Sequence, residues 1–374
     1  MISSSLRRTG VVAALSLVPV FAASAETLTT KRINNAITLS LSADGAVAVG
    51  SIPSTYETFR WTAKDGVVGL GRATLPALGV RSGTASVSAD GKIVAATIVS
   101  DDGTTATAGK WTDSTGWQML TSLGPVPDGM APIDNTDSSA FAISGDGKVI
   151  AGLYWRGETW QAHAMRWTAS KGMKDSGSSG YNSRINAVNA DGTVMVGWDE
   201  HPDFRNWRAT VWIKGVRTVL EDSDWFTEAT AVNSDGTIIV GQTPDPANAM
   251  QMTATMWKWN GSNWDKSFLG VMPKKPGKAA SSMPLAVSND GSVVVGENHP
   301  DANKPTTVGF IWTPATGMVN ATDWLKANGV RVGPLYPVTS LSTVTPDGKF
   351  IAAIETQKVA PFGQRTLLIQ RSPQ

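Results

Sequence analysis

Two His-Pro-Asp triplets hold the side chains best suited to acid–base or ligand chemistry in this sequence, at His201–Asp203 and His299–Asp301. Glu297 stands just before the second triplet. An imidazole with neighbouring carboxylates could act as a general acid–base group or bind a polar ligand. Because Pro-Asp is also common in turns, a loop shape that the sequence uses twice is the alternative interpretation.

Tryptophan residues gather in the same parts of the sequence, with Trp155 and Trp160 in one segment and Trp198 just before the first triplet. Indole faces stack on pyranose rings while nearby carboxylates bind the hydroxyl groups, so these side chains could form a sugar-binding platform. Packing between structural units is the other use of such rings. Trp225 and Trp324 occur at equivalent places after Asp-Gly pairs, which favours a structural role for both. The candidate ligand-binding residues are Trp155, Trp160, Trp198, His201, Asp203, Glu297, His299 and Asp301.

Established catalytic motifs are absent. The sequence has no GxSxG, HExxH, P-loop or dinucleotide-binding GxGxxG pattern, and without any cysteine it has no thiol nucleophile. The remaining histidine, His163, precedes Trp167 in a β-type run and is interpreted as a structural residue. We therefore predict no metal centre and no cofactor, and we favour a binding protein over an enzyme.

A repeat supplies the elements that must position these residues. Asp-Gly occurs seven times in one frame, with Ser, Asn or Thr two residues before the Asp and an apolar run after the Gly. Two β-prone runs around such a turn form a hairpin. Pro346 in the last copy fixes φ near −65°, so we expect a type I turn followed by a left-handed Gly in a G1 bulge. The turn residues are Asp44, Asp90, Asp146, Asp191, Asp235, Asp290 and Asp347.

Each repeat continues with a third and a fourth strand. A Trp in a β-type run follows most of the turns, as at Trp212 and Trp257, and a Gly-containing turn then leads to a short apolar strand. Four antiparallel strands in roughly 50 residues are typical of a propeller blade. The sequence therefore predicts an all-β, seven-bladed β-propeller of four-stranded antiparallel blades, in which the N-terminal strand at 26–35 completes the last blade. The predicted repeats lie near 36–81, 82–137, 138–182, 183–226, 227–280, 281–338 and 339–374.

The repeats resemble the HAF-type extracellular repeat family, named for a His-Ala-Phe tripeptide ahead of the third-strand Trp. HAMRWT at His163–Thr168 matches best, ETFRWT and VGFIWT keep the Phe, and most copies lack the His. The SxDGxVVG frame is the most specific part, and the resemblance covers nearly all of the chain after residue 25. It implies export and a repeat architecture, and it carries over no catalytic residues.

Residues 1–25 have the three parts of a cleaved secretory signal peptide. Two arginines precede the apolar stretch Val11–Ala22, and the small residues Ala23–Ala25 stand before Glu26. A membrane anchor is the alternative, but the stretch is shorter than the roughly 20 residues that a span needs, and it contains Pro19. Cleavage would remove two positive charges and no negative charge, which changes the formal net charge from +1 to −1.

These features favour an exported protein, periplasmic or extracellular, that binds or scaffolds another molecule. A carbohydrate or another cell-surface polymer is the favoured ligand, because aromatic and carboxylate side chains share the predicted loops. A polysaccharide-active enzyme, such as a glycoside hydrolase or lyase, and a protein–protein interaction module are the alternatives. The near-neutral charge argues against nucleic acid as a partner, and no transmembrane segment is expected after signal cleavage.

Overall fold

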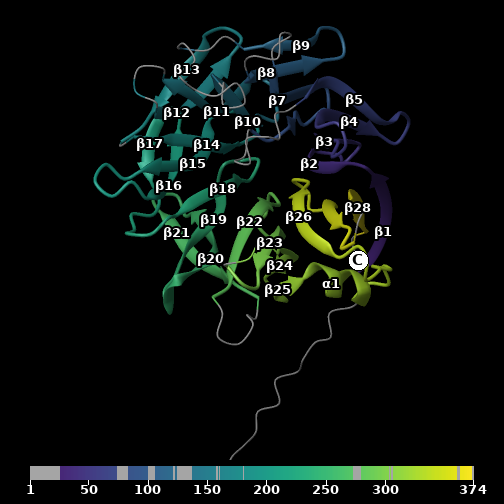
Figure 1. Ribbon diagram of the computed structural model, residues 1–374. Helices are drawn as coiled ribbons and strands as arrows, with labels where there is room; N and C mark the ends of the chain where they lie inside the picture. Colours follow the sequence, from purple (N-terminus) through teal and green to yellow (C-terminus); the bar gives the residue numbers. More distant parts are fainter. Residues whose placement is uncertain are drawn as a thin grey trace, which may run out of the picture.

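Seven four-stranded antiparallel sheets follow one another around a ring in this computed structural model (Figure 1). The fold is the predicted seven-bladed β-propeller. The predicted signal peptide and Trp160 lie outside the described residues. The structure describes residues 26–73, 83–99, 106–120, 123, 137–156, 159, 161–179, 181–272, 279–302, 304, 306–359 and 363–372.

Each blade runs from an innermost to an outermost strand, and every strand pairs with the next in its sheet. The innermost strands are β2 (Ile37–Leu41), β6 (Ser86–Val87), β10 (Ser138–Ile143), β14 (Ser183–Val188), β18 (Glu228–Val232), β22 (Ser281–Val287) and β26 (Val338–Val344). The second strands are β3 (Val47–Ser51), β7 (Ile93–Val99), β11 (Val149–Arg156), β15 (Val194–Glu200), β19 (Ile238–Asp245), β23 (Val294–His299) and β27 (Phe350–Thr356).

The outer half of each blade holds the two remaining strands. The third strands are β4 (Glu57–Thr62), β8 (Ala106–Thr112), β12 (Gln161–Thr168), β16 (Trp207–Ile213), β20 (Asn248–Trp259), β24 (Val308–Thr313) and β28 (Gln364–Ser372). The outermost strands are β5 (Gly66–Ala73), β9 (Gly116–Met119), β13 (Gly172–Gly177), β17 (Val216–Val219), β21 (Trp264–Gly270), β25 (Gly317–Asn320) and, in the seventh blade, β1 (Thr27–Asn34). One short helix, α1 (Ala321–Ala327), follows β25. No described helix is long and apolar enough to cross a membrane.

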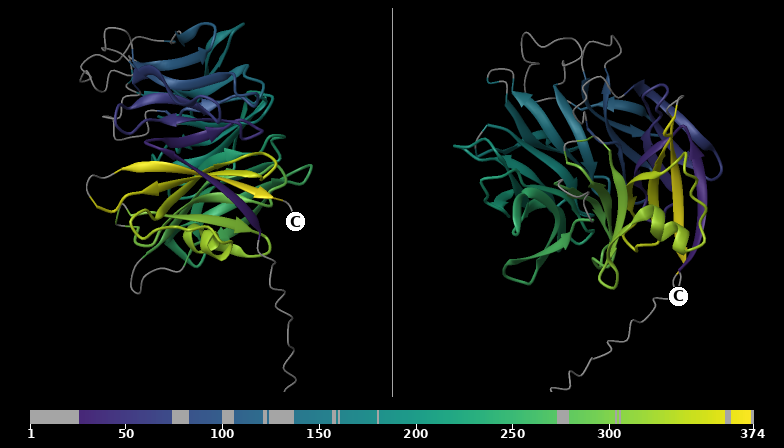
Figure 2. Two further views of the ribbon diagram at one scale, coloured as in Figure 1. Left: turned by 90° about the vertical axis from the view of Figure 1, so that its right-hand side faces the viewer. Right: turned by 60° about the horizontal axis from the view of Figure 1, so that its bottom comes forward.

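The two ends of the described chain meet in the seventh blade. Strand β1 pairs antiparallel with β28 along its whole length, so the N-terminal strand is the outermost strand of the C-terminal blade (Figure 2). The Arg32 guanidinium on β1 donates from Nε to the Glu355 carboxylate on β27 at 2.9 Å. The predicted closure of the ring by the N-terminal strand is thus confirmed.

The Asp-Gly turns are held by their own side chains. In the first repeat, the Asp44 carboxylate accepts hydrogen bonds from the Ser42 hydroxyl at 2.6 Å and from the Ala46 N–H at 3.0 Å. The hydrogen bond from Ser42 keeps the pKa of Asp44 below its usual value. The glycines of all seven pairs have φ between +70° and +79°, which confirms the predicted left-handed conformation.

Neighbouring turns are joined by backbone hydrogen bonds around the ring. The Ala43 N–H donates to the Ala89 carbonyl at 3.0 Å, Ala89 donates to the Gly145 carbonyl at 2.9 Å, and Asn289 donates to the Pro346 carbonyl at 2.7 Å. Pro346 has no N–H, so the seventh turn cannot donate in the same way to the first. The seam between the last and first blades is joined instead by the strand closure and by side-chain hydrogen bonds, such as that from Thr366 Oγ1 to the Ala36 carbonyl at 2.9 Å.

Third-strand tryptophans form the core between blades. Trp212 and Trp257 are almost completely buried, as predicted for inward-facing aromatic residues. Trp257 of blade five packs in one cluster with Val196 of blade four, and Trp212 of blade four packs with Ala151 of blade three. Both indole rings therefore bury apolar surface against the preceding blade, and this burial stabilises the packing of one blade on the next.

We expect removal of β1 to destabilise the entire ring. A chain that begins at Asn35 would leave β28 paired with β27 alone and would expose Leu368, which packs in one cluster with Ile33 of β1. Its melting temperature should fall by more than about 5 °C relative to the chain that begins at Glu26. Equal melting temperatures in a calorimetric comparison would show that the closing strand is dispensable.

A pair of glycine substitutions separates backbone conformation from crowding. Gly192 and Gly348 have similar φ values of +74° and +72°, but an added Cβ would lie 2.3 Å from Val149 Cγ2 at the first position and 3.6 Å from Val293 Cγ2 at the second. Gly348→Ala should cost about 1 kcal/mol from the left-handed backbone alone. Gly192→Ala should cost a further ~1 kcal/mol or more, since the blades must shift. Denaturant unfolding would measure both values, and equal losses would contradict this assignment.

Candidate functional site

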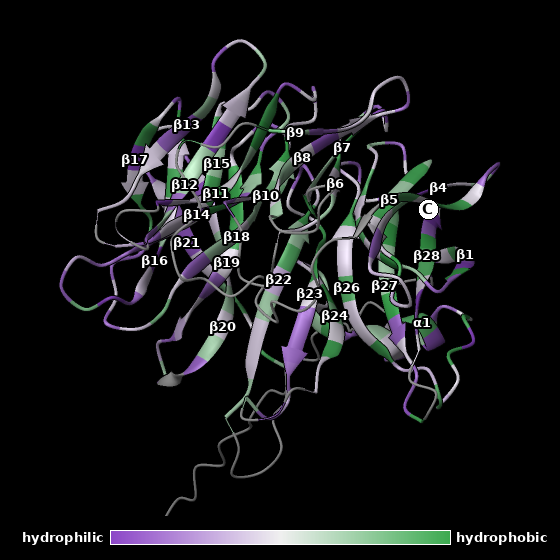
Figure 3. Cartoon of the chain, turned by 45° about the horizontal axis from the view of Figure 1, so that its top comes forward, coloured by the Kyte–Doolittle hydropathy of each residue, from purple (hydrophilic) through white to green (hydrophobic). Residues whose placement is uncertain are grey.

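A central cavity of about 640 Å³ is lined by residues from the innermost strands of all seven blades. We call it the central channel. Its charged lining residues are Arg184 on β14, Glu228 on β18 and Glu297 on β23. Part of β23 is hydrophilic (Figure 3), and Glu297 of this strand lines the channel. The channel therefore receives one of the predicted site residues.

Two of the channel charges neutralise each other. Arg184 Nη2 donates to Glu228 Oε1 at 2.7 Å, and Arg184 Nε donates to Asn186 Oδ1 at 2.7 Å. The guanidinium lies 4.7 Å from the centre of the Phe141 ring and 5.4 Å from that of Trp198. Both charged side chains are buried, and they join blades four and five. Such a pair is needed intact, since loss of either partner would leave a buried charge.

Trp198 lies inside this packing rather than on the surface. Only 5% of Trp198 is exposed, and its ring stacks on Trp207 with centroids 4.4 Å apart and an interplanar angle of 9°. Arg184 covers it as well. This burial argues against a role for Trp198 in stacking on a sugar and agrees with the packing alternative. Trp155, at the end of β11, is half-buried.

The first His-Pro-Asp triplet closes its own loop. The N–H of Asp203 donates to His201 Nδ1 at 3.0 Å, so the imidazole acts as the acceptor that stabilises the turn. The His201 ring also packs on Phe204 at a centroid distance of 4.7 Å. The Asp203 side chain is exposed. This geometry matches the predicted loop shape and does not place the imidazole against the Asp203 carboxylate as a catalytic pair.

The second triplet has a different geometry. His299 Nε2 lies 3.7 Å from Glu297 Oε1, and the Asp301 carbonyl accepts a hydrogen bond from the Lys304 N–H at 2.9 Å. Asp301 is buried. The sequence similarity of the two triplets therefore does not extend to their contacts, and the second triplet adjoins the channel through Glu297.

The third histidine belongs to a polar group in blade three. His163 Nδ1 and the Tyr154 hydroxyl each lie 2.9 Å from Asp175 Oδ2. Burial raises the pKa of Tyr154 to about 12, and its hydrogen bond to Asp175 adds to the shift. This is the structural role that we expected for His163. Among the described residues, no group of three or more His, Cys, Asp or Glu side chains could hold a metal ion.

Three exposed aromatic residues lie in two connected loops of blade four, and one of these loops contains the first triplet. Phe204, Trp225 and Phe226 are 67%, 45% and 55% exposed. Beside them, the Arg205 guanidinium lies 3.7 Å from the centre of the Tyr181 ring. We call these five residues the blade-four aromatic surface. Exposed large apolar side chains that gather in one place are typical of interaction sites.

The sequence does not predict this surface. The equal spacing of Trp225 and Trp324 after Asp-Gly favours a structural role for both, but Trp324 lies in α1 and packs against the core, whereas Trp225 is exposed. The adjacent pair Trp225-Phe226, with Asp222 and Asp224 just before it, was the available signal.

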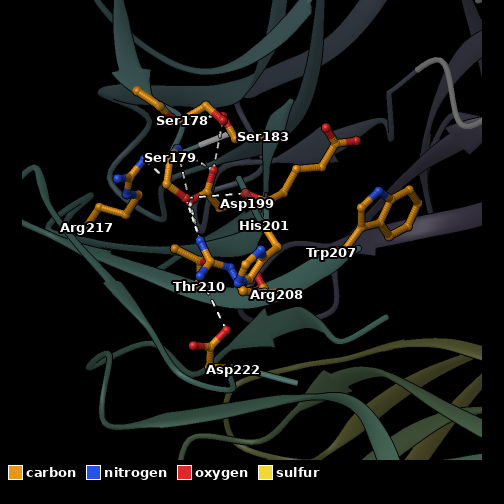
Figure 4. Close-up of polar contacts among 12 residues, drawn as sticks. Ser178, Ser179, Ser183, Asp199, His201, Trp207, Arg208, Thr210, Arg217 and Asp222 are labelled. Carbon is orange, nitrogen blue, oxygen red and sulfur yellow. Dashed lines mark hydrogen bonds and ion pairs between the residues drawn. The ribbon is translucent and has the colours of Figure 1, made fainter. Parts of the chain in front are cut away.

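Blade four also contains a buried polar network (Figure 4). Asp199 on β15 is fully buried, and its carboxylate accepts hydrogen bonds from Ser178 Oγ and the Ser179 N–H, each at 2.9 Å. Arg217 Nη1 and Arg208 Nη2 lie 3.4 Å and 3.7 Å from Asp199 Oδ2. The network holds the connection before β14 against the second and third strands.

The network also reaches the loops that carry the aromatic rings. Arg208 Nη1 lies 3.3 Å from Asp222 Oδ1, and Asn206 Nδ2 donates to the backbone carbonyls of Ser223 and Trp225. The loop with Phe204 is therefore joined to the connection with Trp225. The exposed rings stand on a preorganised base, which lowers the entropic cost of binding a ligand.

The fold and this surface define a β-propeller that is consistent with a binding or protein-interaction module. Among solved structures, the chain is similar to the β-propeller domain of Cps50 (Swd1) from Myceliophteria thermophila, with a TM-score of 0.52 and 12% sequence identity over 91% of this chain and 98% of that chain. It is also similar to TolB from Acinetobacter baumannii, with a TM-score of 0.46 and 14% identity over 73% of this chain and 61% of that chain. The match thus spans less than two thirds of the TolB chain. Likeness at this level of identity shows the fold alone.

No protein-family model matches the chain. No curated protein matches it either. The resemblance to the HAF-type extracellular repeat family stays a prediction.

Asp199 offers a test of the supporting network. Asp199→Asn would remove the charge that faces Arg208 and Arg217 and should lower the free energy of unfolding by about 3 kcal/mol. Asp203→Asn, at an exposed carboxylate on the next loop, is the matched control and should change it by less than ~0.5 kcal/mol. Similar values for both variants in denaturant unfolding would show that the network does not stabilise the blade.

Proposed function

We propose that this protein is an exported binding module that contacts its ligand through the blade-four aromatic surface. The exposure of Phe204, Trp225 and Phe226 on one connected group of loops carries the proposal. Contact of aromatic rings with water is unfavourable, so a ligand that covers these rings lowers the free energy of the system. Export rests on the predicted signal peptide at 1–25 and on the resemblance to the HAF-type extracellular family.

A carbohydrate or another cell-surface polymer is the first ligand class that we propose. Trp225 supplies an exposed indole face, and Asp222 and Asp224 are exposed just before it in the same connection. A flat ring with neighbouring carboxylates is the combination that binds a pyranose, because the ring covers its C–H face and the carboxylates accept hydrogen bonds from its hydroxyl groups.

A protein partner is the second class. Phe204 and Phe226 have no polar edge with which to bind a hydroxyl group, and the stack of Arg205 on Tyr181 adds residue types that are enriched in protein interfaces. The same surface would then act as the apolar centre of an interface, with the neighbouring aspartates at its rim.

The enzyme alternative receives less support from the carboxylates at the ends of the second strands β15 and β27. Asp199 and Glu355 are fully buried and paired with arginines, while the Glu200 carboxylate accepts hydrogen bonds from Asn182. Groups that already hold the protein together are poor candidates for proton transfer to a substrate.

A binding screen with surface variants tests the proposal. The mature protein would be assayed against peptidoglycan, lipopolysaccharide and a panel of soluble polysaccharides. Trp225→Ala combined with Phe226→Ala should weaken binding of any captured polymer more than tenfold, whereas Phe268→Ala, a 45% exposed aromatic on β21 of blade five, should bind like the original protein. Melting temperatures would establish that every variant is folded, because Phe226 also packs against Trp207 at a centroid distance of 5.6 Å.

A photo-crosslinking residue at Phe204 provides the second arm. Specific crosslinks to one envelope protein, without polymer binding, would select the protein partner over the carbohydrate. Polymer binding that survives the double substitution, or crosslinks that occur equally from position 268, would overturn the assignment of function to the blade-four aromatic surface.

A further inference from the structure

The central channel contains a carboxylate, Glu297, that lies outside the blade-four aromatic surface. We propose that the channel is a second binding site, for a small organic cation with an ammonium group and an apolar body, and that the ammonium group binds Glu297. This inference concerns a different part of the molecule and does not depend on the proposed function.

Glu297 is the channel charge without a strong partner. Its side chain is 22% exposed, and His299 Nε2, at 3.7 Å, is beyond hydrogen-bond distance. Among the described residues, the Glu297 carboxylate accepts no hydrogen bond, whereas Arg184 and Glu228 satisfy each other at 2.7 Å. A carboxylate that is largely removed from water without a donor is costly, and a bound N–H cation would offset that cost.

Several neutral polar groups of the channel wall already form hydrogen bonds within the protein. The innermost strands carry β-bulges that leave one residue of each bulged strand unpaired in its ladder, including Asn186 and Thr230. Asn186 Nδ2 donates to the Ala229 carbonyl at 2.8 Å, Thr230 Oγ1 donates to the Pro284 carbonyl at 2.5 Å, and Ser342 Oγ donates to the Thr38 carbonyl at 2.6 Å. Each of these bonds joins a blade to the next, so these side chains hold the wall together and offer a ligand few free donors.

At other bulge positions the wall is apolar. Leu39, Phe141 and Leu285 line the channel, and Met283 lies beside Glu297 across the β22–β23 pair. A cavity of about 640 Å³ has the size of a site for a small organic molecule. A partly apolar wall with one carboxylate that accepts no hydrogen bond from the described residues favours a ligand with a single positive charge and a hydrocarbon portion over an anion, because an anion would face Glu297.

Isothermal titration of the mature protein with matched probes tests this inference. The cations are n-hexylammonium and phenethylammonium, and 1-hexanol and hexanoate serve as the neutral and anionic probes of similar size. We expect both ammonium ions to bind and hexanoate not to bind. Glu297→Gln should weaken ammonium binding at least tenfold, since it removes the charge but keeps the shape of the side chain.

Glu221→Gln is the matched control. Glu221 has the same 22% exposure as Glu297 but forms an ion pair with Lys266 outside the channel, so this variant should bind the ammonium ions like the original protein. Melting temperatures would establish that both variants are folded. The inference is overturned if neither ammonium ion binds at millimolar concentration, if hexanol or hexanoate binds as tightly, if Glu297→Gln retains full affinity, or if Ca²⁺ occupies the site in preference to the amines.

Discussion

The pairing of β1 with β28 is the contact on which the rest of the ring depends. Every other blade is built from one continuous stretch of chain, and backbone bonds such as Ala43 to Ala89 join neighbouring turns. At the last turn, Pro346 has no N–H with which to continue this pattern. Closing the seventh blade with a strand from the opposite end of the chain ties first and last blades together, and only a closed ring gives a channel lined on all sides.

Buried charge is placed where adjacent elements must keep a defined geometry. Asp199 with Arg208 and Arg217 holds the loops of blade four, and Arg184 with Glu228 joins blades four and five. Such networks add little net stability compared with apolar packing, but breaking them is costly, so they specify one arrangement of loops. The aromatic rings that we propose to bind the ligand therefore stand on a rigid base although they lie in connections between strands.

Much of the fold could be predicted because it follows from short-range chemistry that recurs. A Ser or Thr hydroxyl, an Asp carboxylate and a left-handed Gly make the same turn wherever they occur, as Ser42 and Asp44 illustrate. The site could not be predicted to the same degree. Trp198 and Trp225 are the same residue type, yet Trp198 is buried and Trp225 is exposed. The difference arises because exposure depends on which side chains of other strands and loops pack against each indole.

Local chemistry by itself therefore determined the turns, the four-stranded repeat and, through the unpaired strand at 26–35, the closure of the propeller. Tertiary structure alone decided that Trp198 would stack on Trp207 beside Arg184, that Arg184 would pair with Glu228 of the next blade, and that Glu297 would line the channel. The physical reason is range. Turns and strand patterns depend on residues a few positions apart, whereas burial and charge pairing depend on strands and blades that come together only when the chain folds.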